Sequence, residues 1–323
     1  MADNLEKSIL STLAFYDILG LPLTGFEIQK YLIRHRPLAA GHLDIELSDV
    51  LEALENSEFL KSKIGQKLGF YFLSGRDYLA VSRIEKQKLA DLKWRKLRRL
   101  VFLLRGFPFV KMAMVTGSLA FGNVKDESDF DILIFAKSGR IWTVRFLTTL
   151  FFWTLGLRRS EKNTRDKICL NHYLAEDALE IKSRNLYEAQ AYARFLPVLE
   201  NEVGFYRKFC AANAWMGDWL VYWPEKFADC EAGDVAGQKK VKVSRLLDFK
   251  RRSLEIMLGG KMGDLLEKTL KKIQLRHIER HPLKDKIGGR IVASDGELEF
   301  HPELHSRKIL EEYERRSTTI DKF

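Results

Sequence analysis

The chain begins with apolar side chains at the spacing of helices. In residues 5–20 the apolar positions recur every three or four residues, which predicts a helix with one buried face, and Gly20 can end it. A second helix is expected within residues 21–35. Thr24 is its predicted N-cap, because Glu27 lies three residues later and completes a capping box. The pattern therefore predicts two helices separated by a short turn.

A third helix and a β-hairpin follow. Residues 47–60 have a helical pattern with Ser48 as the expected N-cap. Residues 61–76 alternate around Gly65 and Gly69 as a hairpin does. Three helices followed by a hairpin resemble a winged helix-turn-helix, a fold often used to bind DNA. The resemblance predicts a winged-helix-like domain at the N-terminus.

The predicted third helix is acidic. Positions 46 to 58 contain no Lys or Arg, and their acidic residues are Glu46, Asp49, Glu52, Glu55 and Glu58. A helix that enters the major groove of DNA must approach phosphates and usually supplies basic side chains. DNA binding by this domain is therefore doubtful, and protein contact or scaffolding is the better prediction.

After residue 105 the pattern changes from mainly helical to alternating strands and helices. A basic helix over residues 83–105 ends at Gly106 and Pro108, after which strand patterns alternate with a turn, an apolar helix and loops. From about residue 183 to about 280 the chain is predicted to be helical, apart from a loop at 221–238. A short β-like piece and a final helix close the chain. These elements predict an α+β protein with a mixed β-sheet.

Residues 141–157 are strongly apolar. The stretch is 17 residues long and contains Arg145, whereas a helix that crosses a bilayer needs about 20 apolar residues. We therefore expect a helix buried against the sheet, and no membrane partner.

Basic residues are concentrated in two segments. The formal net charge is +10 at pH 7; residues 239–290 contain 16 Lys/Arg and 6 Asp/Glu, and residues 83–105 contain 9 basic and 2 acidic residues. Such segments attract phosphate-rich partners such as RNA or nucleotides, or they form solvated helix faces. Sequence alone leaves both alternatives open.

Cysteine usage and the N-terminus favour a cytoplasmic location. The three cysteines are odd in number and lack the spacing of a thiolate zinc site. The first ten residues include acidic side chains where a signal peptide would be basic, and no apolar core with a cleavage site follows.

Asp129 and Asp131 indicate metal chemistry. They are two positions apart in a β-patterned run, so their side chains project from one face of the predicted strand. Two adjacent carboxylates repel each other unless cations compensate them. Mg²⁺ prefers oxygen ligands, and a pair of such ions can hold the oxygens of a phosphoryl or nucleotidyl displacement. We therefore expect Mg²⁺ as cofactor, with two ions when a nucleotide is bound.

The turn before this strand is suited to binding phosphate. Gly117 and Ser118 follow a buried strand and open a short helix; glycine allows close approach of the backbone, and N–H groups at a helix start bind phosphate oxygens. Gly117-Ser118, followed after ten residues by Asp129-Phe130-Asp131, resembles the signature of the polymerase-β-like nucleotidyltransferase superfamily. The strand-helix-strand pattern extends the resemblance to about residues 105–180.

The resemblance implies a nucleotidyltransferase sheet with helices on one face, in which Asp129 and Asp131 bind Mg²⁺ and are catalytic. The nucleotide-binding residues that it implies, or that share the loop, are Gly117, Ser118, Gly122, Asn123, Lys125 and Ser128. The predicted domains are 1–82, winged-helix-like; 83–105, a basic connecting helix; 106–185, the nucleotidyltransferase catalytic domain; and 186–323, a mainly helical basic domain.

Members of this superfamily usually add a third carboxylate from a later strand. The strand expected to supply it, residues 167–174, has Asn171 and His172 at its centre. The candidates for the third position are Asn171, Asp166, Glu176 and Asp177. Either one of the flanking acids completes the site or the catalytic step is impaired.

Histidine and tryptophan patterns favour structural roles. Two histidine pairs have the i,i+4 spacing of helical metal sites but no third ligand at a fitting distance, which favours surface histidines. Three tryptophans spaced by four favour one helix face packed on a core over a base-stacking platform. These residues are His277/His281, His301/His305, Trp215, Trp219 and Trp223.

The sequence therefore predicts Mg²⁺-dependent transfer of a nucleoside monophosphate from an NTP, with ATP as the expected donor. The acceptor is RNA or another polyanion if residues 239–290 face the Asp129/Asp131 pocket, and a small molecule or protein hydroxyl if they face away. The alternative is a catalytically impaired transferase-fold protein that acts as a nucleotide-sensing or DNA-binding regulator. One half of a toxin–antitoxin pair is a weaker alternative.

Overall fold

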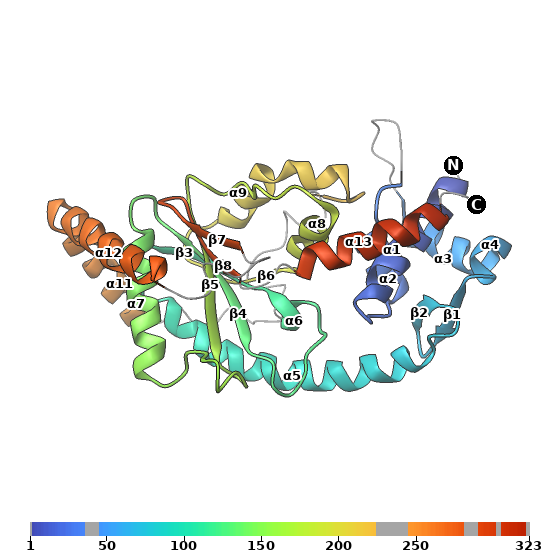
Figure 1. The fold of residues 1–323 in the computed structure, drawn as a ribbon, viewed down its shortest axis with the longest axis horizontal. Coiled ribbons are helices and arrows are strands. Elements are labelled where there is room, and N and C mark those ends of the chain that lie inside the picture. The colour runs from blue at the N-terminus through green and yellow to red at the C-terminus, as the bar shows by residue number, and fades with distance from the viewer. Residues whose placement is uncertain (1, 36–44, 224–244, 281–289, 302–304, 321–323) are drawn as a thin grey trace.

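The computed structural model describes residues 2–35, 45–223, 245–280, 290–301 and 305–320. Its described part is α+β, with a mixed six-stranded sheet in the order β6-β3-β4-β5-β8-β7 and a separate two-stranded hairpin, β1-β2. Figure 1 shows the sheet on one side of the molecule and the N-terminal helices on the other, with the long helix α5 running beneath both.

The N-terminal part has helices followed by a hairpin, as predicted, but the predicted third helix is divided at Ser57 into two, α3 and α4. Its elements are α1 (Ala2–Ile18), α2 (Gly25–Lys30), α3 (Leu47–Asn56), α4 (Glu58–Lys61), β1 (Ile64–Lys67), β2 (Phe70–Leu73) and α5 (Tyr78–Leu104). The predicted capping box is confirmed, since the Thr24 hydroxyl accepts a hydrogen bond from the Glu27 N–H at 3.2 Å. The predicted N-cap Ser48 is wrong. Helix α3 begins after Glu46, whose N–H donates to the Asp49 carboxylate at 2.7 Å.

The hairpin turns at Leu68 and Gly69, whose φ angles are 55° and 79°. A left-handed pair of this kind suits glycine at the second position and connects two twisted strands closely. Gly65, the other glycine in the predicted hairpin, lies within β1, opposite Phe72.

The central sheet is antiparallel except for the neighbouring strands β4 and β5, which are parallel. Its first elements and their helices are β3 (Val110–Val115), α6 (Gly117–Ala120), β4 (Phe130–Ala136), α7 (Ile141–Thr154), β5 (Ile168–Ala175), α8 (Leu186–Arg194), β6 (Leu196–Glu200) and α9 (Phe205–Ala212). Strand β4 is antiparallel to β3 and parallel to β5. Strand β6 was predicted as helix, but it pairs antiparallel with β3. Five residues with a proline are too short for a helical period to be read reliably.

The sheet also includes strands from near the C-terminus. The last elements are η1 (Ala214–Asp218, a 3₁₀ helix), α11 (Arg245–Leu258), α12 (Lys261–Glu279), β7 (Arg290–Ala293), β8 (Glu297–His301) and α13 (His305–Ile320). Strand β8 pairs antiparallel with both β5 and β7, and α13 packs on α1. The sheet therefore extends across the predicted domain boundary at residue 185.

Helices cover both faces of the sheet, and the prediction of helices on one face is wrong. Phe135 of β4 packs edge-on against Phe205 and Phe209 of α9, with ring centroids 5.7 and 5.4 Å apart. The adjacent Ile134 belongs to the opposite core cluster, which contains Trp142 of α7. Consecutive apolar residues in β3 and β4, without alternation, are typical of strands that are buried on both sides.

The apolar segment is confirmed as a helix that packs against the sheet, although only one of its faces is buried. In α7, Trp142, Val144 and Phe152 are at most 1% exposed. None of the helices in the described ranges is both long and apolar enough to cross a membrane.

The three tryptophans do not share a helix face, which corrects the prediction. Helix α9 ends before Asn213, and only Trp215 of the three lies in η1. The Asn213 side chain accepts from the Ile181 N–H at 2.8 Å and donates to the Leu179 carbonyl at 2.9 Å. These bonds to a distant segment compete with continuation of the helix.

Candidate active site

The two aspartates meet at the start of β4. Asp129 is the last residue of the preceding loop, and Asp131 is the second residue of the strand. Their carboxylate oxygens and the Cys169 sulfur all lie within 4.8 Å of one another. Parallel pairing of β4 with β5 places Cys169 directly beside Asp131. The third donor at this point of the sheet is thus a thiol that the sequence did not indicate.

Gly117 packs against the Asp131 carboxylate. Its φ is 62°, and a Cβ atom at this position would lie 2.2 Å from Asp131 Oδ2. The Thr116 N–H also donates to the Asp131 carbonyl at 3.0 Å, which fixes the turn against the strand. Gly117 and Ser118 open α6, so their N–H groups have no acceptor within the helix. The turn therefore brings backbone donors beside the carboxylates.

The environment of Asp131 is unfavourable for its charged form. Burial, followed by repulsion from Asp129, raises the pKa of Asp131 to about 6, although a hydrogen bond with Cys169 partly offsets the increase. Burial and the same two carboxylates raise the pKa of the Cys169 thiol. The pair of aspartates thus carries negative charge in a poorly solvated space.

Arg159 supplies a positive charge at the site. Its Nε lies 3.1 Å from Asp129 Oδ2, and its guanidinium donates to the Cys169 sulfur at 3.6 Å. Arg159 and Asp129 form an ion pair, but the geometry is not that of a hydrogen bond. No other group of the described residues donates a hydrogen bond to the buried Asp129 Oδ2. Arg159 therefore compensates part of the charge and leaves this oxygen without a directed partner.

The donor set fits a hard divalent cation. Two close carboxylates, one with an oxygen that lacks a directed donor, provide the ligands that Mg²⁺ prefers. The Cys169 thiol would suit a softer metal and adds no oxygen ligand. Asp129 and Asp131 are therefore the two residues that could hold Mg²⁺ here.

Asp166 does not join this group. Its carboxylate lies 2.8 Å from the Lys93 ammonium and also pairs with Lys96. These two lysines hold the pKa of Asp166 below its usual range even though burial acts in the opposite direction. Asp166 therefore anchors the loop to α5.

The other candidates for the third position also lie elsewhere. Glu176 pairs with Lys111 at 3.1 Å, at the far end of β5. The seven residues from Cys169 to Glu176 span on the order of 23 Å in a strand. Asp177 is the next residue and is exposed. Asn171 lines a cavity described below.

The other predicted nucleotide-binding residues mostly stabilise the conformation of the loop between α6 and β4. Gly122 has a φ of 64°. The Asn123 amide donates to the Leu19 carbonyl at 2.9 Å, which ties the loop to the end of α1. The Ser128 hydroxyl accepts from the Lys125 N–H at 2.9 Å, while the Lys125 residue is exposed. Of the predicted nucleotide-binding residues, Gly117 and Ser118 thus adjoin the carboxylates most directly.

Lys93 is a structural residue that the sequence reading missed. It is 2% exposed, and its ammonium donates to the carbonyls of Asp126 and Ser128 at 2.9 and 2.8 Å. These bonds fix the loop that leads into Asp129. Lys93 lies between Ala90 and Leu97 on the apolar stripe of α5, which is the signal that distinguishes it from its solvated neighbours.

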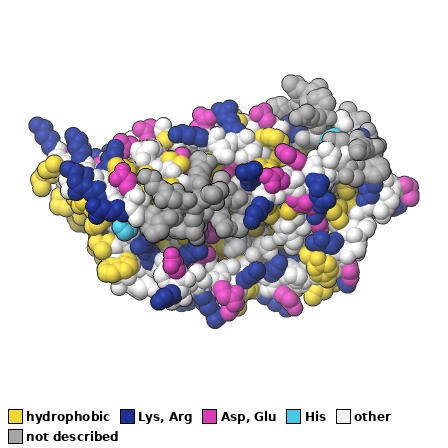
Figure 2. All heavy atoms as spheres, viewed as in Figure 1, with side chains coloured by type: hydrophobic (Ala, Val, Ile, Leu, Met, Phe, Trp, Pro, Cys, Tyr) yellow, Lys and Arg dark blue, Asp and Glu magenta, His cyan; other side chains and the backbone are white. Residues whose placement is uncertain are grey.

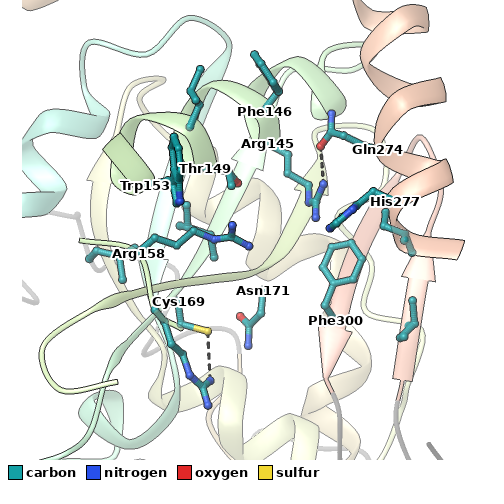
Figure 3. A pocket seen from close by; sticks show the side chains of 16 residues that line it. Arg145, Phe146, Thr149, Trp153, Arg158, Cys169, Asn171, Gln274, His277 and Phe300 are labelled. Atoms are coloured by element: carbon teal, nitrogen blue, oxygen red, sulfur yellow. Dashed lines mark hydrogen bonds between the residues drawn. The ribbon is translucent and has the colours of Figure 1, made fainter. Parts of the chain in front are cut away.

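A cavity of about 460 Å³, shown in Figure 3, lies beside β5 and α7. Its wall includes Cys169 and Arg159, so the cavity extends to the residues around Asp129. Helices α7 and α12 and strands β5, β7 and β8 supply the rest of the lining. Among its most prominent side chains are Arg145, Trp153, Arg158, Asn171, His277 and Phe300. The described residues of the lining include three arginines and no Asp or Glu.

A second titratable group is separate from this site. His172, Glu297 and Glu299 are buried, with donor atoms within 4.8 Å of one another, and His172 Nε2 is 3.4 Å from Glu297 Oε1. The register places Glu299 two strands and three residues away from Asp131, on the order of 14 Å. Glu299 is therefore too distant to serve as the third carboxylate.

None of the described Lys or Arg residues in the basic segment 239–290 lines the cavity. Only Gln274, His277 and Ile278 of its described residues line the cavity. Figure 2 shows Lys and Arg beside hydrophobic side chains at the end of the molecule that α11 and α12 form. The described part of this segment therefore does not place a basic surface at the candidate site.

Comparisons with protein-family models, with curated proteins and with solved structures gave no match to this chain. Function is therefore inferred from the geometry of the site.

Proposed function

We propose that the protein is an Mg²⁺-dependent nucleotidyltransferase of the polymerase-β-like type. It transfers a nucleoside monophosphate from an NTP, with ATP as the expected donor, to an acceptor and releases pyrophosphate. The observation that carries the proposal is the Gly117 backbone packed against the Asp131 carboxylate, with Asp129 beside it. This is the combination of a phosphate-binding turn and paired metal ligands that the signature implies.

The residues of the site have separate roles in this proposal. Asp129 and Asp131 hold the metal, and Gly117 and Ser118 offer backbone N–H groups to the phosphates. Mg²⁺ supplies charge neutralisation at the phosphate oxygens and a template for in-line displacement. Arg159 would have to release Asp129 Oδ2 for a cation to bind there, because both would compete for the same oxygen.

Labelled nucleotides test the proposal. The purified protein is incubated with Mg²⁺, each α-labelled NTP and separated small-molecule, RNA and protein fractions of a cell extract. We expect label in one fraction. Asp129→Asn and Asp131→Asn should each lower the rate by at least about 100-fold, because each removes a charged group that acts on the transition state.

The matched control is Asp177→Asn, which removes an exposed carboxylate at the far end of β5. This variant should transfer label at the wild-type rate. Labelling that persists unchanged in both site variants would refute the assignment of Asp129 and Asp131.

A nucleotide-binding regulator without transfer activity is the second candidate. It is favoured by the thiol of Cys169 at the place of the third carboxylate and by the ion pair of Arg159 with Asp129. Mg²⁺-dependent ATP binding in calorimetry, without label transfer to any fraction, would support it. The variant Cys169→Asp should then gain transfer activity, whereas Cys169→Asn should not.

The DNA-binding form of this alternative is disfavoured. The acidic residues of the third helical region are exposed, namely Glu46, Asp49, Glu52, Glu55 and Glu58. Salt-dependent binding of duplex DNA by the full chain at low ionic strength would support a DNA-binding role. We expect no such binding by the N-terminal surface.

A further inference from the structure

The cavity beside the candidate site has the electrostatics of an anion receptor. Arg145, Arg158 and Arg159 line it, and no acidic side chain from the described part of the chain does. Figure 3 shows the Arg145 and Arg158 side chains directed into the same space, with the Asn171 amide below them. Guanidinium groups bind phosphate and carboxylate oxygens through paired hydrogen bonds.

Arg145 and Arg158 extend into the same space, and neither is paired with a carboxylate of the described residues. Burial, the largest effect, lowers the pKa of Arg145. Tyr173 acts in the opposite direction, and the charge of Arg158 lowers the pKa further. No carboxylate within the described ranges forms an ion pair with Arg145 or Arg158. Arg145 is held by Gln274 and by the Phe300 ring, whose centroid lies 4.7 Å from the guanidinium carbon. The positive charge is thus positioned in advance, and an anion would stabilise it.

The other wall of the cavity is apolar and open to a ligand. Phe146, Leu150 and Trp153 of α7 line it and are 38, 41 and 64% exposed. Their surfaces offer contact to an aromatic or branched aliphatic body. A volume of about 460 Å³ is in the range of small-molecule sites.

The cavity also lies where an acceptor must approach. Strand β3, which leads into the Gly117 turn, is on one side of β4, and β5 with Cys169 is on the other. In-line displacement requires the attacking and leaving oxygens on opposite sides of the transferred phosphorus. With the triphosphate at Gly117, the nucleophile enters from the side of Cys169 and Arg159.

We infer that the acceptor is a small amphipathic anion, a phosphomonoester or a carboxylate with an apolar body, that attacks through its own anionic oxygen. The site has two carboxylates and a thiol, and no third carboxylate of the described residues is present to take a proton from an acceptor hydroxyl. An anionic oxygen carries no proton to remove, so it needs no such base.

The proposed step balances without a further reactant. The anionic oxygen forms a bond to the α-phosphorus as the bond from that phosphorus to the β-bridging oxygen breaks, and pyrophosphate leaves with the electron pair. The product is a phosphoric anhydride from a phosphomonoester, or a mixed acyl anhydride from a carboxylate. This chemical step rests on the proposed function, whereas binding of the anion in the cavity does not.

Binding is tested with two dyes that share the same rings. The full chain is titrated, without Mg²⁺ or NTP, with 1-anilinonaphthalene-8-sulfonate and with the neutral N-phenyl-1-naphthylamine. We expect saturable binding of the sulfonate. Arg158→Gln should weaken it by about tenfold and change the neutral dye by less than about twofold, because only the charge contact is lost. Trp153→Ala should weaken both dyes.

The control is Arg307→Gln, which removes an exposed arginine on α13 and should bind both dyes as the wild type does. Phenyl phosphate and benzoate are then used as competitors, and the stronger one identifies the preferred anionic head. Sulfonate affinity that is unchanged in both Arg158→Gln and Arg145→Gln, or displacement by neither competitor, would overturn the anion site.

Transfer is tested separately with α-labelled ATP and either phenyl phosphate, benzoate or phenol as acceptor. We expect label on one of the two anions and none on phenol. Label on phenol alone, or on RNA alone, would overturn the inferred acceptor while the nucleotidyltransferase assignment stands. Anion binding with no transfer to any acceptor would instead count against the proposed function and leave the anion site intact.

Discussion

Glu27 and Asp131 are two carboxylates in poorly solvated surroundings that the structure treats in opposite ways. Glu27 lies 3.0 Å from Arg83 and 3.3 Å from Arg194. Burial alone would raise the pKa of Glu27, but the two arginines outweigh it and hold the pKa below its usual value. Asp131 has another carboxylate as its neighbour, and its pKa is raised to about 6.

The difference lies in how completely each charge is compensated within the chain. Arg194 is 3% exposed, stacks over the rings of Tyr16 and Tyr31 and joins α8 to the N-terminal helices through Glu27. This network is compensated within the chain. The Asp129/Asp131 pair is only partly compensated, as is typical of groups that bind a cation or act in catalysis.

The largest expected effect comes from breaking the compensated network. Glu27→Gln leaves two arginines in poorly solvated positions without their counter-ion and should lower the free energy of unfolding by about 3–5 kcal/mol. Urea denaturation at pH 7 measures this loss. Glu52→Gln, on the exposed face of α3, should change stability by less than about 0.5 kcal/mol. Equal effects of the two substitutions would contradict a structural role for Glu27.

The same type of substitution at Asp131 should raise the free energy of unfolding instead of lowering it. Above pH 6 and without metal, Asp131→Asn removes an unfavourable buried charge and should stabilise the protein by about 2–3 kcal/mol, since a shift of about two pKa units corresponds to that energy. Because the folded pKa of Asp131 lies above its ordinary value of 3.8, the contribution of Asp131 to stability should fall as pH rises from about 4 to about 6 and then level off. The stability of the variant minus that of the wild type should therefore increase over this pH range and then stay constant. A variant less stable than wild type at pH 8 would contradict the account.

Metal binding should follow the ionisation of Asp131. The affinity for Mn²⁺, used as a spectroscopic substitute for Mg²⁺, should rise about tenfold per pH unit below pH 6 and become constant above it, because the ligand must lose a proton. Calorimetric titrations between pH 5 and 8 measure this slope. An affinity independent of pH over the whole range would exclude Asp131 as a ligand.

Substitution of Gly117 should abolish Mn²⁺ binding and lower stability modestly. Gly117→Ala and Gly139→Ala both place a side chain at a φ above 60°, which costs about 1–2 kcal/mol. Only the first puts a methyl group against Asp131; at Gly139 no atom lies within 4 Å of the new Cβ. We therefore expect Gly117→Ala to be the less stable of the two variants, because Asp131 must shift to admit the methyl group, and we expect loss of Mn²⁺ binding in Gly117→Ala alone. Normal Mn²⁺ binding by Gly117→Ala would show that the contact with Asp131 is not required.

The local parts of the site were predictable from sequence because they depend on neighbouring residues. A glycine at a strand end and two aspartates two positions apart specify a turn and a pair of carboxylates within about fifteen residues. The partners from distant segments were not predictable in this way. Cys169 is beside Asp131 only because β5 pairs in parallel with β4 in one register. A shift of one residue in the pairing would have presented another side chain.

The fold was predictable to a similar extent. The capping box at Thr24, the hairpin and the buried helix α7 follow from local periodicity. Strand β6 and the addition of β8 to the edge of β5 depend on which strands find each other across the chain. The arginine-lined cavity likewise combines α7, the loop after it and α12, so its charge is visible only in three dimensions.

The most direct test of the central claim is Mn²⁺ binding by electron paramagnetic resonance at pH 8, with and without ATP. The wild type should show a Mn²⁺ site that ATP strengthens, and the double variant Asp129→Asn/Asp131→Asn should lose that site while remaining folded. If the double variant binds Mn²⁺ and ATP as the wild type does, the two aspartates are not the metal ligands and the proposed function is wrong.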